Sequence, residues 1–177
     1  AQKGLETTLV ERDAYGGTCL NRGCIPSKAY ITAANVAHRA ATAEEMGVHA
    51  DPAVDMAAMN TWKNGVVDQL TGGVEKLCKG NGVQLREGTA QFVDEHTVRV
   101  LEQQGDDGEA ITFENAVVAT GSRPMSIPGF DFADDPVWAS RDALAAQSVP
   151  DRLVVVGAGY IGMELSTMFA KVGADHD

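Results

Sequence analysis

The glycine-rich run Gly157-Ala158-Gly159-Tyr160-Ile161-Gly162 constrains the fold of this chain more than any other feature. It follows the apolar stretch Leu153 to Val156, which is typical of a strand buried in a parallel sheet. The apolar period after it predicts a helix from Tyr160 to Val172. In this setting the first glycine forms a tight turn, the second allows close approach to the backbone, and the third lets helix and strand pack. The run therefore predicts an α/β strand-turn-helix unit.

The start of the chain contains a second unit of this kind. Leu5 to Val10 is a short β-rich run that ends before Glu11, and the residues after the Gly16-Gly17 loop predict a helix from Ile25 to Ala43. A glycine turn at a helix N-terminus is a favourable site for a phosphate group. We therefore expect two nucleotide-binding folds, with a dinucleotide at the turn that begins at Gly157. A glycine turn that only packs is the alternative.

The middle of the chain predicts a long helix and then short strands. An apolar period of three and four predicts a helix from Val54 to Lys79, which ends at Gly80-Asn81-Gly82. The period then changes to two, which predicts a small meander. Its expected strands are Val83 to Arg86, Ala90 to Val93, Thr97 to Leu101 and Ile111 to Phe113. Proline and glycine residues after Ser122 indicate a connector between domains.

The charge balance restricts the class of partner. The chain has 25 acidic and 14 basic residues, a formal net charge of -11. Nucleic acids and anionic membranes bind through clustered Lys and Arg, so neither is expected as a partner. No run of about 18 apolar residues predicts a membrane span. The two remaining interpretations are an ordinary acidic cytoplasmic protein and an adaptation to high salt, in which counterions screen carboxylate repulsion.

The two ends of the sequence indicate a longer protein. The chain begins at Ala1 without an initiator Met, and it ends at Asp177, just after another predicted helix. We expect both ends to be interior points of the complete chain. The residue that would separate NAD from NADP binding is expected about 20 residues past the glycine run, beyond Asp177.

The segment from Gly16 to Lys28 carries the strongest chemical signal. Cys19 and Cys24 can form a disulfide if the backbone brings their Cα atoms within about 7 Å, and the start of a helix provides that curvature. A helix N-terminus also lowers a thiol pKa, which makes a reactive thiolate available. A structural disulfide is one alternative. A zinc site is another, although it needs about four ligands and only Cys78 and scattered histidines remain.

This segment resembles the active-site segment of the dihydrolipoamide dehydrogenases, which are class I pyridine nucleotide-disulphide oxidoreductases. The resemblance covers all thirteen positions of GGTCLNRGCIPSK. It continues through Trp62-Lys63, Gln69-Leu70-Thr71-Gly72-Gly73, Gly88-Thr89-Ala90, Ala119-Thr120-Gly121-Ser122-Arg123-Pro124 and the glycine run at Gly157. The acidity makes the chain similar to versions of this family from salt-loving archaea.

The resemblance implies four catalytic residues. Cys19 corresponds to the thiol that exchanges with the substrate, and Cys24 to the thiol that lies against the flavin. Lys28 corresponds to a lysine near the flavin N5 atom, where it favours the reduced, negatively charged form. Glu164 corresponds to the carboxylate that pairs with this lysine. A catalytic histidine is expected from the partner subunit, and no histidine of this chain matches its motif.

The resemblance also implies two cofactor sites, one for FAD and one for NAD. The residues implied for FAD are Glu11, Gly16, Gly17, Thr18, Cys19, Lys28, Gly88, Ala90, Thr120, Gly121 and Ser122. Those implied for NAD are Gly157, Gly159, Tyr160 and Gly162. Two positions depart from the family. Ala90 stands where many relatives have glycine, and Arg22 stands where they have an uncharged residue.

The implied architecture is an α/β flavoprotein with two Rossmann-like dinucleotide-binding domains, incomplete at both ends. Residues 1–121 are expected to form an FAD domain that lacks its first strand and glycine-rich loop. Residues 122–152 form the connector, and residues 153–177 begin the NAD domain.

The implied reaction is oxidation of protein-bound dihydrolipoamide with NAD as acceptor. The expected partners are the lipoyl domain of a 2-oxoacid dehydrogenase-type complex and a second copy of the chain in a homodimer. One alternative is another disulphide reductase, acting on glutathione-like thiols or mercury. The other is a non-enzymatic module that senses redox state.

Overall fold

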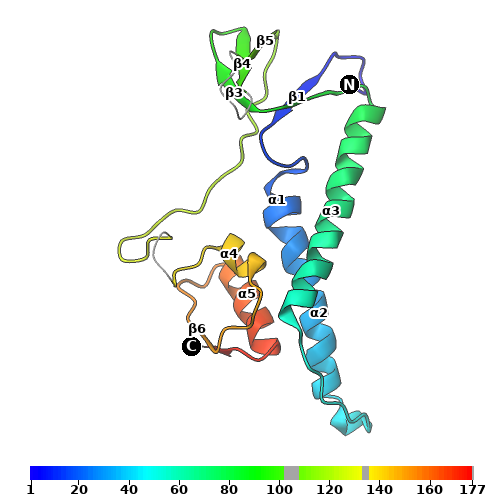
Figure 1. Ribbon diagram of the computed structural model, residues 1–177, viewed down its shortest axis with the longest axis vertical. Coiled ribbons are helices and arrows are strands. Elements are labelled where there is room, and N and C mark those ends of the chain that lie inside the picture. Colours follow the sequence, from blue (N-terminus) through cyan, green and yellow to red (C-terminus); the bar gives the residue numbers. More distant parts are fainter. Residues whose placement is uncertain (102–107, 133–135, 177) are drawn as a thin grey trace. The chain divides into compact units, whose positions relative to one another are not determined.

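The computed structural model describes residues 1–101, 108–132 and 136–176 (Figure 1). The chain forms two compact units, each built from two stretches of sequence. The first unit comprises Ala1–Gly17 and Gln69–Ser122, and the second comprises Thr18–Asp68 and Arg123–Asp177. The long helix α3 (Met56–Gly80) contributes to both. The predicted domain boundaries at 121 and 152 remain predictions.

The first unit contains a parallel strand pair. Strand β1 (Thr8–Glu11) pairs with β2 (Gln84–Glu87), and Glu11 lies opposite Glu87. The prediction that Val83 to Arg86 begins the meander is therefore wrong in its pairing. Its period of two is correct for a strand, but that period carries no information about which partner lies beside it. A parallel partner needs a long crossover, and the intervening helices provide it.

The predicted meander follows as a separate sheet in the same unit. Strands β3 (Thr89–Phe92), β4 (Thr97–Leu101) and β5 (Glu109–Thr112) are antiparallel, in the order β3-β4-β5. Gly88 separates β2 from this sheet with a φ of +147°. A Cβ at Gly88 would lie 2.6 Å from the Leu101 carbonyl oxygen, so no larger residue fits without a shift of the backbone.

The second unit is mainly helical. Its helices include α1 (Gly17–Arg22), α2 (Cys24–Ala41), a 3-10 turn at Glu44–Met46, α4 (Ser140–Ala145) and α5 (Tyr160–Lys171). Helices α2 and α5 match the predicted ranges to within two residues. The core of this unit is centred on Tyr30 and Phe169, both fully buried, and residues of α3 and α4 pack against them.

The strand before the glycine run is shorter and more open than predicted. Strand β6 (Arg152–Leu153) pairs in parallel with β7 (Asp175–His176). The side chains of Val154 and Val156 are 63% and 57% exposed, contrary to the predicted burial. Both residues follow the end of β6 at Leu153, and the sheet that contains β6 has two strands within the described ranges.

Helix α4 is an element that the sequence patterns did not predict. It lies in the connector, where prolines dominate the local signal. Its start is capped by Asp142, whose Oδ2 atom accepts a hydrogen bond of 2.8 Å from the Ala139 backbone N–H. None of the helices formed by residues 1–101, 108–132 and 136–176 is long and apolar enough to cross a membrane.

Candidate redox site

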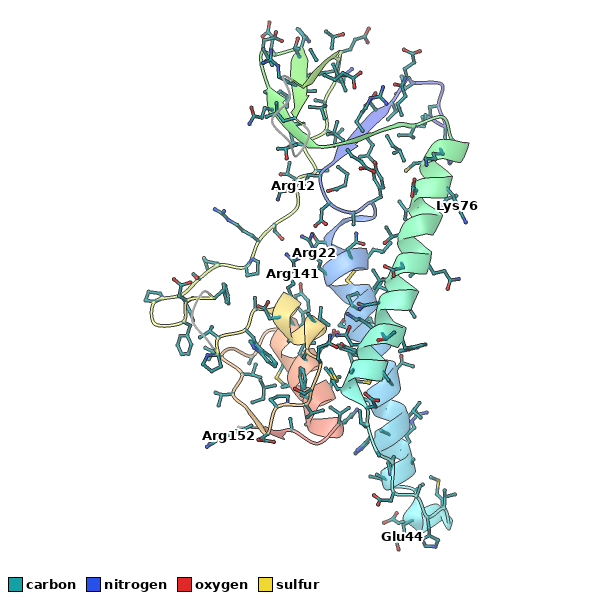
Figure 2. All side chains as sticks on the ribbon, in the orientation of Figure 1. Arg12, Arg22, Glu44, Lys76, Arg141 and Arg152 are labelled. Carbon is teal, nitrogen blue, oxygen red and sulfur yellow. A yellow bond between two sulfur atoms is a disulfide. The ribbon has the colours of Figure 1, made fainter. Side chains whose placement is uncertain are left out.

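Cys19 and Cys24 form a disulfide at the start of helix α2 (Figure 2). Their Cα atoms are 4.8 Å apart, which confirms the predicted bridging distance. Cys19 lies within α1, and Cys24 is the first residue of α2, the helix that continues through Lys28. Both cysteines are exposed. The bridge therefore joins two helices at a point that another thiol can reach.

Gly23 sets the distance between the two cysteines. It is the residue between α1 and α2, and a Cβ at this position would lie 3.3 Å from the Cys19 Cα atom and 3.3 Å from the Thr18 carbonyl oxygen. Contacts that short require the neighbouring backbone to move. Glycine thus allows α2 to begin directly over the backbone of Cys19, and the two sulfur atoms meet as a result.

Lys28 and Glu164 form the ion pair that the resemblance implied. The Lys28 Nζ atom donates to Glu164 Oε1 at 2.8 Å and to Oε2 at 3.1 Å. Ser27 donates its hydroxyl to Oε2 at 3.3 Å. The hydrogen bond from Lys28 holds the pKa of Glu164 below its ordinary value, and the Lys28 charge and the Ser27 hydroxyl act in the same direction. The predicted contact is confirmed.

A second polar contact joins the same two helices. The Lys171 Nζ atom donates to Asn35 Oδ1 at 2.7 Å. Asn35 lies seven residues after Lys28 on α2, and Lys171 lies seven residues after Glu164 on α5. Since the order of the contacts is the same on both helices, α2 and α5 run parallel. An apolar depression of about 250 Å³ lies beside these contacts. Its lining residues are Ile31, Met163, Glu164, Thr167, Met168 and Lys171.

The glycine turn before α5 has the properties of a phosphate-binding turn. Gly157 has a φ of +107°, and a Cβ at Gly157 or Gly159 would meet nothing within 4 Å. The backbone of this turn is therefore open to a ligand. A Cβ at Gly162 would lie 3.0 Å from the Gly157 carbonyl oxygen and 3.1 Å from Val155 Cγ1. This third glycine keeps the helix close to the strand, as expected for the fingerprint. The exposed side chain of Tyr160 starts the helix.

Glu11 is held in place at the end of β1. Its Oε1 atom accepts hydrogen bonds from the backbone N–H groups of Arg12 at 2.9 Å and Asp13 at 3.0 Å. The Gly88 N–H donates to the Glu11 carbonyl oxygen at 2.9 Å, so the start of the Gly88-Thr89-Ala90 segment lies beside this strand end. A carboxylate fixed in this way is able to accept hydrogen bonds from the hydroxyls of a ribose, which fits the role implied for Glu11.

The remaining residues implied for FAD lie in turns and irregular segments. Gly16 and Gly17 have φ values of +111° and +77°, and Gly121 has +73°. Thr18 is exposed on α1, while Thr120, Gly121 and Ser122 are exposed in a segment without regular structure. Their contacts with a cofactor remain predictions.

The third cysteine does not take part in the Cys19–Cys24 bridge. Cys78 is a free, partly buried cysteine on α3. Among the residues that the structure describes, no group of three or more His, Cys, Asp or Glu side chains is arranged to hold a metal ion.

Three comparisons place this geometry in a context. The chain is 69% identical over 176 residues to dihydrolipoyl dehydrogenase of Haloferax volcanii, covering 99% of this chain and 37% of that protein. It is 65% identical over 177 residues to dihydrolipoyl dehydrogenase of Halobacterium salinarum, covering 98% and 37%. Its fold matches the HOCl-induced flavoprotein disulfide reductase RclA from Escherichia coli with a TM-score of 0.81 at 26% identity, covering 98% and 36%.

The structure thus has an exposed cysteine bridge at one helix start and an open glycine turn before a second helix. Residues 1–176 match the family described as pyridine nucleotide-disulphide oxidoreductase, and the chain belongs to this family. It spans 37% of the length of the two dehydrogenases from halophilic archaea.

Proposed function

We propose that the protein containing this chain oxidises protein-bound dihydrolipoamide to lipoamide with NAD as acceptor. The observation that carries the proposal is the exposed Cys19–Cys24 disulfide at the start of the helix that presents Lys28 to Glu164. The identities of 69% and 65% to two dihydrolipoyl dehydrogenases support this substrate over other thiols.

The cysteine pair provides the thiol exchange. A thiolate of the dihydrolipoyl group attacks the Cys19 sulfur, and the bond to Cys24 breaks with Cys24 leaving as a thiolate. The second substrate thiol, after losing its proton to a base, attacks the mixed disulfide. Lipoamide then leaves, and Cys19 and Cys24 hold the two electrons as thiols. FAD, held by the residues proposed for it below, would supply the transfer of this electron pair from the two thiols to NAD.

The Lys28–Glu164 pair supplies a fixed positive charge one helical turn after Cys24. Glu164 holds the Lys28 ammonium group through two hydrogen bonds, and Ser27 fixes the carboxylate in turn. A charge that is already fixed in place stabilises negative charge that develops during the reaction, because no group has to reorient at that moment. Lys28 is proposed to act in this way towards the flavin ring.

The cofactor sites follow the local geometry of the two units. Glu11 and the segment after Gly88 are proposed to hold the adenosine part of FAD, with Thr120-Gly121-Ser122 nearby in the bound state. The bare backbone of Gly157 and Gly159 is proposed to hold the diphosphate of NAD. Tyr160 and Gly162 complete that turn.

The partners and the location follow from the same reaction. We propose a homodimer, because the family resemblance implies a histidine base supplied by the partner subunit. The substrate would be the lipoyl domain of a 2-oxoacid dehydrogenase-type complex, and the location the cytoplasm. We also propose that residues 1–177 alone neither bind FAD tightly nor turn over.

The test is a substrate comparison with the full-length protein. Dihydrolipoamide should support NAD reduction, whereas NADPH should reduce glutathione disulfide and mercuric ion poorly. A preference for either of the latter would identify a different disulphide reductase. Flavin binding without NAD reduction by any thiol would identify a redox-sensing module.

A further inference from the structure

Lys63 is a buried cation on helix α3. Its side chain on α3 is 6% exposed, and within the described parts of the chain it forms no ion pair. Its Nζ atom donates to the Leu144 carbonyl oxygen at 2.8 Å and lies 5.3 Å from the centre of the Tyr30 ring. Burial lowers the pKa of Lys63, and the charge of Asp68 opposes that change. Burying an ammonium group is costly, so its two neutral partners must hold it in a specific place.

Those contacts cap the end of helix α4. Lys63 binds the Leu144 carbonyl, and Asn60, one turn earlier on α3, donates its Nδ2 to the Ala146 carbonyl at 3.1 Å. Asn64 donates to Asn60 Oδ1 at 2.8 Å and so orients that amide. A six-residue helix is not stable by itself. We therefore attribute the position of α4 to these side chains of α3.

Helix α4 in turn supports the helix that carries Glu164. Ala143 and Leu144 belong to one buried cluster with Leu165 and Phe169 of α5. The ring of Trp138, just before α4, lies 6.3 Å from the Phe169 ring. Since Leu165 follows Glu164 directly in the sequence, a shift of α4 changes the position of that carboxylate.

Lys63 also reaches the redox helix directly. Tyr30, whose ring it contacts, is fully buried and lies two residues after Lys28 on α2. The Tyr30 hydroxyl is buried, and its pKa is raised by burial to about 12, with the Asn60 side chain opposing the rise. A neutral phenol ring thus packs under the ammonium group. One side chain of α3 therefore contacts both α2 and the support of α5.

We propose that Lys63 is a positioning residue for the Lys28–Glu164 pair. It holds α4 through the Leu144 carbonyl and α2 through Tyr30, and both contacts fix the distance between the ammonium group of Lys28 and the carboxylate of Glu164. The consequence for turnover rests on the proposed function, whereas the consequence for the ion pair does not.

The test uses full-length protein with Lys63→Met, which keeps the length of the side chain and removes its charge. We expect kcat with dihydrolipoamide to fall about tenfold, because small misplacements of reacting groups are costly. The acidic transition of the Glu164 carboxyl, followed by its carbon NMR signal, should also move upward towards pH 4.5, the ordinary pKa of that group. Lys76→Met, at an exposed position on the same helix, should change neither value.

A double-mutant cycle separates positioning from general stability. In a Glu164→Gln background the acidic transition is absent, and Lys63→Met should lower kcat less than twofold further, because both changes affect the same contact. Equal tenfold losses in both backgrounds, or an unmoved acidic transition in Lys63→Met, would overturn the proposal. Asn60→Ala removes the Ala146 hydrogen bond and the acceptor for Asn64, leaves Lys63 in place, and provides the same readouts if Lys63→Met does not fold.

The two proposals fail in different ways. A wild-type protein without activity on dihydrolipoamide contradicts the proposed function. The melting temperatures of Lys63→Met, Glu164→Gln and the double variant then decide the inference about Lys63. Non-additive changes support it, and additive changes overturn it.

Discussion

The glycine turn before α2 and the glycine turn before α5 differ in what they offer to a ligand or substrate. At the start of α2 the turn is closed by side chains: Gly23 lies against the Cys19 backbone, and a disulfide joins Cys19 to Cys24. At the start of α5 the turn is open, and a Cβ at Gly159 would meet no atom within 4 Å. The first turn carries its reactivity in two sulfur atoms, whereas the second offers only backbone.

This difference predicts different responses to substitution. In the closed turn, each added or removed atom changes a contact that is already made, so stability and chemistry change together. In the open turn, an added methyl group changes a contact that exists only when a ligand is bound. A substitution at Gly159 should therefore change ligand affinity with little change in stability. A substitution at Gly23 should change stability and chemistry together.

The largest expected effect is from Cys24→Ser. The variant retains one thiol, but it has no disulfide to accept the electron pair from the substrate. We expect kcat with dihydrolipoamide to fall by at least about a thousandfold, as for other residues that act as a unit. Steady-state NAD reduction by the full-length protein measures it. Cys78→Ser, which removes the free cysteine, should keep the wild-type rate.

Gly159→Ala tests the open turn. Its φ of -72° suits alanine, and there is space for the methyl group, so the melting temperature should change little. The methyl group would nevertheless occupy the expected path of the diphosphate, and we expect the KM for NAD to rise about tenfold to a hundredfold. Initial rates at varied NAD concentration measure this change.

Gly162→Ala is the matched comparison in the same turn. Its Cβ would lie 3.0 Å from the Gly157 carbonyl oxygen, so both the melting temperature and the affinity for NAD should fall. Equal melting losses in Gly159→Ala and Gly162→Ala would contradict the description of the turn as open at its second glycine.

Gly23→Ala tests the closed turn. The new methyl group would press on Cys19 Cα and the Thr18 carbonyl, and overpacking of this kind costs about 1–3 kcal/mol of the free energy of unfolding. Thermal unfolding of the oxidised protein measures it. Gly65→Ala in the interior of α3 has open space and should instead stabilise by about 0.5–1 kcal/mol. Equal melting temperatures for Gly23→Ala and Gly65→Ala would contradict the close contacts found at Gly23.

Local sequence patterns predicted the parts of this molecule that depend on neighbouring residues. The bounds of α2 and α5 and three of the four strands predicted for the meander follow from short-range periodicity, and the spacing of Cys19 and Cys24 permitted a bridge at a helix start. The Lys28–Glu164 contact was predicted only through the family resemblance, because a separation of 136 residues carries no local signal.

The missed features depend on contacts between distant segments. Helix α4 is short, and its end is capped by Lys63 and Asn60, which are 81 and 86 residues away from the carbonyl groups they bind. The parallel pairing of β2 with β1 has the same origin. Exposure of Val154 and Val156 was missed for the opposite reason: an apolar run predicts burial, but burial requires neighbouring strands that residues 1–101, 108–132 and 136–176 do not provide.

The smallest expected effect concerns the ion pair beside the closed turn. Because Lys28 lowers the pKa of Glu164 below its ordinary value of 4.5, the pair stabilises the folded protein above about that pH. The stabilisation is lost as the pH falls below 4.5 and through the lowered pKa of the folded state. The wild-type protein should therefore melt at a higher temperature than Glu164→Gln at pH 7, and the gap should close on acidification.

Salt should raise the overall stability without changing the difference in melting temperature between wild type and Glu164→Gln at pH 7. In about 1 M salt the screening length is only about 3 Å, so repulsion among carboxylates spread over the surface is removed. With a net charge of -11, the melting temperature should rise with KCl concentration in wild type and in Glu164→Gln alike. The Lys28 Nζ atom lies 2.8 Å from Glu164 Oε1, within the screening length, so the difference between the two proteins at pH 7 should persist. A flat dependence on KCl would indicate an ordinary acidic protein, and a gap that vanishes in salt would reduce the pair to a screened surface contact.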